Sequence, residues 1–139
     1  MNAARPPRGF STVLLVAAVY FVMGIGFAAL AARSGTGAVR TVWRLGAWLA
    51  SFAVFAVQVG YQHARHRLAP AANARRAALA VAVAGFALAV SATIHGRTDP
   101  SHQHLRVLAM LLWPLAGGLP AFAAAWVLAA VLARLRRSG

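Results

Sequence analysis

The chain has 139 residues, of which 61% are hydrophobic and 11% are charged. Soluble domains carry about 25% charged residues, so this composition excludes an ordinary soluble domain, and its high hydrophobicity excludes an intrinsically disordered chain. The 14 basic residues are all arginines and face a single Asp, and the absence of Cys excludes disulfide and thiolate chemistry. The sequence therefore predicts a small integral membrane protein whose arginines bind anionic lipid head groups rather than nucleic acid.

Four apolar stretches cover about residues 11–32, 45–62, 77–94 and 105–132. Each is close to the roughly 20 residues that a helix needs to cross a bilayer. The alternation of Ala and Val at 80–84 fits a strand, but it lies inside a long apolar run, and four strands cannot close a barrel. We therefore expect residues 1–139 to form one membrane domain, an all-α bundle of four antiparallel transmembrane helices.

The first apolar stretch also has features of a secretory signal. Arg5 and Arg8 precede it, and Ala29-Leu30-Ala31 resembles a cleavage site. The stretch is longer than the usual ~7–15 apolar residues of a signal peptide. We therefore expect it to remain as the first transmembrane helix.

The distribution of arginines predicts the orientation. One side holds both termini and the loop at 63–76, with nine arginines: Arg5, Arg8, Arg65, Arg67, Arg75, Arg76, Arg134, Arg136 and Arg137. The opposite side holds five: Arg33, Arg40, Arg44, Arg97 and Arg106. Both termini are thus expected to be cytoplasmic. The abundance of Ala, Arg and Gly without Lys suggests a bacterial source, and hence the bacterial inner membrane.

Small and large side chains form separate stripes on the second and third stretches. The small stripes comprise Gly46, Ala50, Ala53 and Gly60, and then Ala78, Ala82, Gly85, Ala89 and Ala92. The large stripes comprise Trp48, Phe52 and Phe55, and then Leu79, Val83, Phe86, Val90 and Ile94. Small stripes allow helices to approach closely in lipid, whereas the aromatic stripe offers a surface for a partner subunit, a pigment or a quinone.

Histidines suggest metal or haem binding at two places. His95, Asp99, His102 and His104 surround one loop and have side chains that bind divalent metals, although Arg97 and Arg106 would repel a cation. His63 and His66 follow the second stretch, and a haem there needs a ligand from a second protomer or from another subunit. Ser91, His95 and Asp99, spaced by four, also invite a nucleophile–base interpretation. A loop at the membrane interface is the simpler interpretation, so no cofactor is predicted.

The fourth stretch is interrupted by residues that disfavour a regular helix. Pro114, Gly117, Gly118 and Pro120 lie near its midpoint, and they predict a kink or a break. A broken helix exposes backbone groups from which transporters build binding sites.

The leading functional hypothesis is a non-catalytic accessory subunit of a larger inner-membrane complex of the respiratory or photosynthetic type. Its expected partners are other membrane subunits and anionic lipids, and we predict no enzymatic activity. The expected interface residues are Trp48, Phe52, Phe55, Gln58, Trp113 and Trp126. One alternative is a small homo-oligomeric transporter or channel at the broken fourth helix, and another is a metal- or haem-binding protein that uses the periplasmic histidines.

Overall fold

The computed structural model describes residues 8–66, 68–95 and 103–136, and these residues form four helices. The helices are α1 (Arg8–Ala32), α2 (Gly37–His66), α3 (Pro70–His95) and α4 (Gln103–Leu135). Each is long and apolar enough to cross a membrane. This confirms the predicted all-helical chain with four candidate spans and indicates a multi-pass membrane protein.

Polar residues end α1 and begin α2. The Ser34 hydroxyl donates a hydrogen bond to the Leu30 carbonyl (2.9 Å), which satisfies an acceptor in the last turn of α1. The Thr36 hydroxyl accepts a hydrogen bond from the Val39 N–H (3.4 Å), as an N-cap residue does. The next connection is also short, and Pro70 occupies the first position of α3, where a missing N–H costs nothing.

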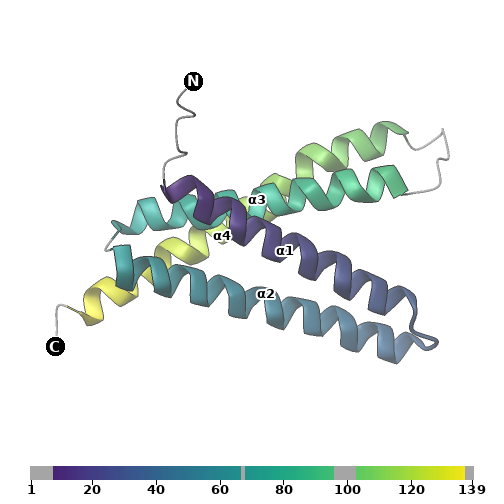
Figure 1. Cartoon of the computed structure of the whole chain (residues 1–139), viewed down its shortest axis with the longest axis horizontal. Coiled ribbons are helices and arrows are strands. Elements are labelled where there is room, and N and C mark those ends of the chain that lie inside the picture. Colours follow the sequence, from purple (N-terminus) through teal and green to yellow (C-terminus); the bar gives the residue numbers. More distant parts are fainter. Residues whose placement is uncertain (1–7, 67, 96–102, 137–139) are drawn as a thin grey trace, which may run out of the picture.

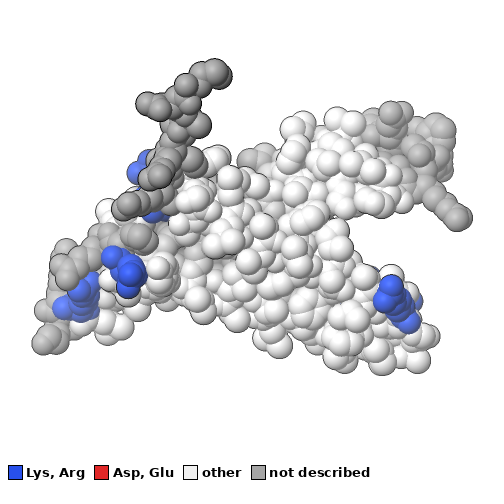
Figure 2. Space-filling model, viewed as in Figure 1, with Lys and Arg blue, Asp and Glu red and all other residues white. Residues whose placement is uncertain are grey.

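The helices form two pairs that cross (Figure 1). α1 lies beside α2, α3 lies beside α4 over the largest interface in the molecule, and α3 also contacts α1 and α2. Within the described ranges, no Cα atom of α1 lies within 8 Å of a Cα atom of α4. The two pairs diverge toward the end that holds the α1–α2 turn, where Figure 2 shows an open wedge between them.

The interior is built mainly from alanine. The buried apolar residues are Val13, Ala17, Val59, Ala74, Ala77, Ala80, Ala84, Ala89, Ala125 and Ala129. Within this set, Val59 of α2 forms a cluster with Ala74 and Ala77 of α3 and with Ala125 and Ala129 of α4. Three helices therefore converge at one end of the molecule, and we call these five residues the core cluster.

Glycines bring α4 close to α3. A Cβ atom at Gly118 would lie 3.3 Å from the Ala82 Cβ and 3.6 Å from the Ala78 carbonyl oxygen. A Cβ atom at Gly117 would lie 3.2 Å from a methyl group of Val81. The predicted small stripe of α3 is thus the surface that α4 packs against, with close approach replacing the hydrophobic effect as the source of stability.

In the large stripe of α3, Leu79, Val83, Phe86 and Ile94 are exposed, whereas Val90 is half-buried. The small stripe of α2 is used only in part. Gly46 packs under the Phe27 ring, with 3.1 Å between a built Cβ and the nearest ring atom, whereas Gly60 has no neighbour within 4 Å of that position. The small stripe of α2 is therefore not packed at Gly60, although α3 meets α2 at the adjacent Val59.

Replacing Gly118 by Leu should weaken the α3–α4 interface. The added side chain has no room beside Ala82, whose Cβ is fixed to the backbone, so we expect a loss of about 1–3 kcal/mol in the free energy of unfolding. The change is measured by far-UV circular dichroism of the protein in mild-detergent micelles to which SDS is added stepwise.

Gly26→Leu is the matched control because Gly26 has open space around it. It makes the same exchange within a helix and should leave stability within about 0.5 kcal/mol of the wild type. Equal losses in the two variants would contradict the assigned α3–α4 contact.

Candidate functional site

Three buried amide side chains gather next to the core cluster. Gln58 and Gln62 lie on α2, Asn73 lies in the first turn of α3, and their exposed fractions are 5%, 1% and 0%. Gln58 and Gln62 share a face of α2 because they are four residues apart. We call these three residues the amide layer.

One hydrogen bond joins the amide layer across two helices. The Asn73 Nδ2 donates to the Val59 carbonyl oxygen at 3.0 Å, which ties the start of α3 to α2. The Asn73 Oδ1 and both amide atoms of Gln58 and Gln62 are buried and find no hydrogen-bond partner within the described residues. Both ring nitrogens of the half-buried His63 are likewise buried without a hydrogen-bond partner in this part of the chain. Such atoms are costly in an apolar environment, so the layer has unused hydrogen-bonding capacity.

The chemistry of the amide layer is that of neutral donors and acceptors. An amide NH2 group donates and its oxygen accepts, so the layer suits water or a neutral polar group. The Asn73–Val59 hydrogen bond also fixes the position of the start of α3 relative to α2. Polar residues between membrane helices commonly have this role. Gln58, one of the expected interface residues, has its side chain buried within the bundle.

The sequence interpretation did not single out Gln62 or Asn73. The available signal was the four-residue spacing of Gln58 and Gln62 on one helix face, together with an Asn at the start of the third span.

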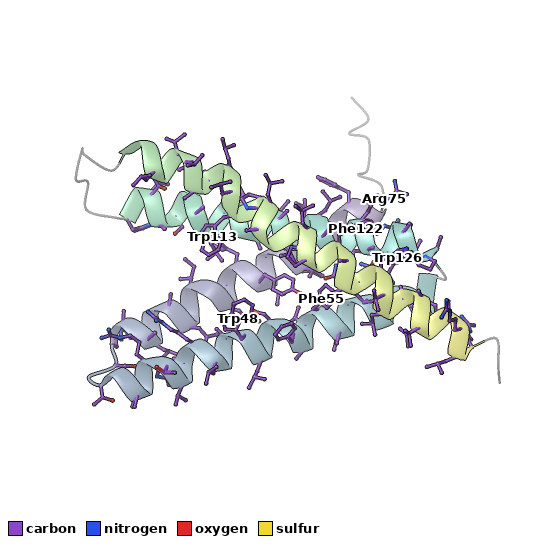
Figure 3. All side chains as sticks on the ribbon, turned by 180° about the vertical axis from the view of Figure 1, so that it is seen from behind. Trp48, Phe55, Arg75, Trp113, Phe122 and Trp126 are labelled. Carbon is purple, nitrogen blue, oxygen red and sulfur yellow. The ribbon has the colours of Figure 1, made fainter. Side chains whose placement is uncertain are left out.

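The remaining expected interface residues lie on α2 and α4, and Figure 3 labels Trp48, Phe55, Trp113 and Trp126 among them. Trp48 and Phe52 of α2 are 65% and 63% exposed, and their rings lie 6.1 Å apart. Trp113 and Trp126 of α4 are also exposed, whereas Phe55 is partly buried against the core cluster. Four of the six residues are therefore free to meet lipid or another subunit.

The described arginine side chains lie at the two ends of the molecule and leave its middle uncharged, as Figure 2 shows on one face. One end carries Arg65, Arg75, Arg76, Arg134 and Arg136, and the other carries Arg33, Arg40 and Arg44. This distribution matches an apolar slab bounded by two charged surfaces.

The proposed metal site falls mostly outside the described residues. Asp99 and His102 lie there entirely, as does the side chain of His104. His95 closes α3, and its Nδ1 lies 2.9 Å from the Ser91 carbonyl oxygen of the preceding turn. No group of three or more metal-ligating side chains occurs within the described part of the chain.

The helix-breaking residues lie within an uninterrupted helix. α4 continues through Pro114, Gly117, Gly118 and Pro120 without an unwound segment. The two glycines form the contact with α3 described above, so close packing explains their presence without a broken helix.

Comparison with known protein families, with curated proteins and with solved structures finds no match to this chain.

Two substitutions separate the bonded and unbonded members of the amide layer. Asn73→Ala removes the bond to the Val59 carbonyl, so we expect a loss of about 0.5–1.5 kcal/mol in unfolding free energy. Gln62→Met, of similar length, removes two polar atoms without partners and should be neutral or stabilising. SDS unfolding measures both. A loss in Gln62→Met as large as that in Asn73→Ala would show that the Gln62 amide has a partner in the intact protein.

Proposed function

We propose that this protein is a non-catalytic accessory subunit of a larger membrane complex in the bacterial inner membrane. The observation that carries this proposal is a ridge of bulky apolar side chains on the outer surface of α2. Val42, Leu45, Leu49 and Phe52 are all more than half exposed, and Trp48 lies beside them. Their spacing of three and four places them on one helix face.

The spacing of this ridge favours a helix from another subunit as its partner. Residues at alternating intervals of three and four form the seam of left-handed helix pairs, in which side chains of one helix enter gaps of the next. The interior of the bundle uses alanine and glycine instead, so the bulky side chains stand on the outside. The exposed rings of Trp48 and Phe52 add rigid contact area, which is common at protein interfaces.

The proposal includes an antiparallel arrangement of the four helices with both termini in the cytoplasm. The start of α1, the α2–α3 connection and the end of α4 lie toward one end of the molecule, which supports this arrangement (Figure 1). This is also the end with the larger number of described arginines, in line with the positive-inside rule.

Removing the aromatic part of the ridge should release the protein from its complex. The double variant Trp48→Ala/Phe52→Ala deletes exposed side chains and should fold normally, but it should lose its partner subunits during gentle extraction. Native mass spectrometry of the extract measures retention, and an absorption spectrum of the same sample shows whether the complex carries respiratory or photosynthetic cofactors.

Leu15→Ala/Val22→Ala serves as the control, because these residues are exposed to the same degree on α1. It should keep its partners. Equal retention by both double variants would count against the ridge, and a wild-type sample consisting only of this chain would count against the accessory role.

The natural absence of Cys allows a direct test of orientation. Gly35→Cys lies in the open α1–α2 turn, and Ala64→Cys lies at the exposed end of α2. In spheroplasts, a membrane-impermeant maleimide should label Gly35→Cys at once and Ala64→Cys only after lysis. The reverse pattern would mean that the termini face outward.

A further inference from the structure

A groove of about 560 Å³ lies between α1 and α2, close to the turn that joins them. This volume falls within the range of about 300–1,000 Å³ that is typical of sites for small ligands. The groove exists because α1 contributes small residues along it, including Gly24, Ala28 and Ala31. These are spaced by four and three, so they lie on one face of α1, and Leu88 of α3 packs against this face at Gly24.

One end of the groove is strongly basic. Arg40 and Arg44 line it from α2, one helical turn apart, and both are exposed. Within the described residues neither guanidinium group has a hydrogen-bond or ion-pair partner, and the chain's single acidic side chain, Asp99, lies outside them. Arg40 lies within the first turns of α2, where the helix dipole also favours an anion.

The rest of the groove is apolar and carries aromatic rings at the level of the arginines. Trp43 and Trp48 line it from α2, and the Trp43 ring packs against Phe27 of α1 with 6.2 Å between ring centres. Tryptophan is enriched where hydrocarbon meets lipid head groups. The groove therefore has a charged end followed by an apolar part. A phospholipid has the same order, with a charged head group followed by an acyl chain.

We propose that this groove binds one anionic phospholipid, with its phosphodiester on Arg40 and Arg44 and an acyl chain along Gly24, Ala28 and Ala31. Guanidinium groups bind phosphate oxygens in pairs, which fits two arginines on adjacent turns. Two other occupants fit less well. A free phosphate ion would leave the apolar part of the groove empty, and an apolar helix would cover the charges of Arg40 and Arg44 without compensating them. A phospholipid satisfies both parts of the groove.

The charged end is tested by removing arginines one at a time. The wild type and its variants are placed in nanodiscs of phosphatidylcholine with a minor fraction of phosphatidylglycerol, and native mass spectrometry then measures the phosphatidylglycerol retained on the released protein. Retention should fall about fivefold in Arg44→Gln and about thirtyfold in Arg40→Gln/Arg44→Gln, given the usual contribution of each arginine to binding an anionic lipid. Arg33→Gln, at the same end but outside the groove, should retain the lipid like the wild type.

The apolar part needs its own variant with all charges intact. Ala28→Leu fills this part of the groove and should also lower retention, while circular dichroism confirms the helical content. Equal retention in all variants, or equal losses in Arg33→Gln and Arg44→Gln, would overturn the proposal. Competition by soluble glycerol 1-phosphate would overturn it as well, because the charges alone would then suffice.

The lipid site and the accessory role fail independently. Arg40, Arg44 and Ala28, which are changed in the lipid experiment, do not belong to the ridge on α2. Trp48 borders both the ridge and the groove, so the lipid experiment leaves it unchanged. A protein without partner subunits could still hold the lipid, and a subunit of a complex could lack it.

Discussion

Close contact between α3 and α4 is the interaction on which the other features of the structure depend. Apolar surface gains little by leaving lipid for a protein interior, so helices in a membrane associate through packing and interhelical hydrogen bonds. Gly117 and Gly118 allow α4 to approach the alanine face of α3 to near the limit of van der Waals contact. α3 then serves as the central helix, and α1 and α2 pack against it. The bulky side chains stay outside because the interface has no room for them.

The amide layer adds direction to this packing. Alanine faces are uniform, so helices that meet only through alanine can slide or rotate with little loss of contact. The hydrogen bond from Asn73 to the Val59 carbonyl is specific to one register of α2 and α3. The neighbouring amides of Gln58 and Gln62 place further polar atoms at the same level of the bundle. Close packing thus holds the helices together, and the amide layer selects one register of α2 and α3.

The number and type of the elements could be predicted from the sequence, because four apolar stretches of sufficient length allow few other solutions. The helix bounds could not, since hydropathy falls at Arg40 and Arg44 although helical geometry continues through them. Gln58 shows a second limit: periodicity places it on a face of α2 but does not say which helix meets that face. The same holds for Gly117 and Gly118, whose residue types fit both a break and a close contact. Only the position of α3 distinguishes the two.

The crossing of the two helix pairs has a consequence for how the molecule sits in a bilayer. Pairs that cross cannot both stand along the membrane normal, so at least one must be tilted (Figure 1). α2 and α4 contain 30 and 33 residues, and at 1.5 Å per residue even the shorter is about 45 Å long, well beyond a hydrocarbon core of about 30 Å. Tilt reduces the thickness that a long helix spans. The tilt imposed by the crossing therefore lets helices that are longer than the hydrocarbon core fit within it. The bundle suits a bilayer thinner than its helices are long.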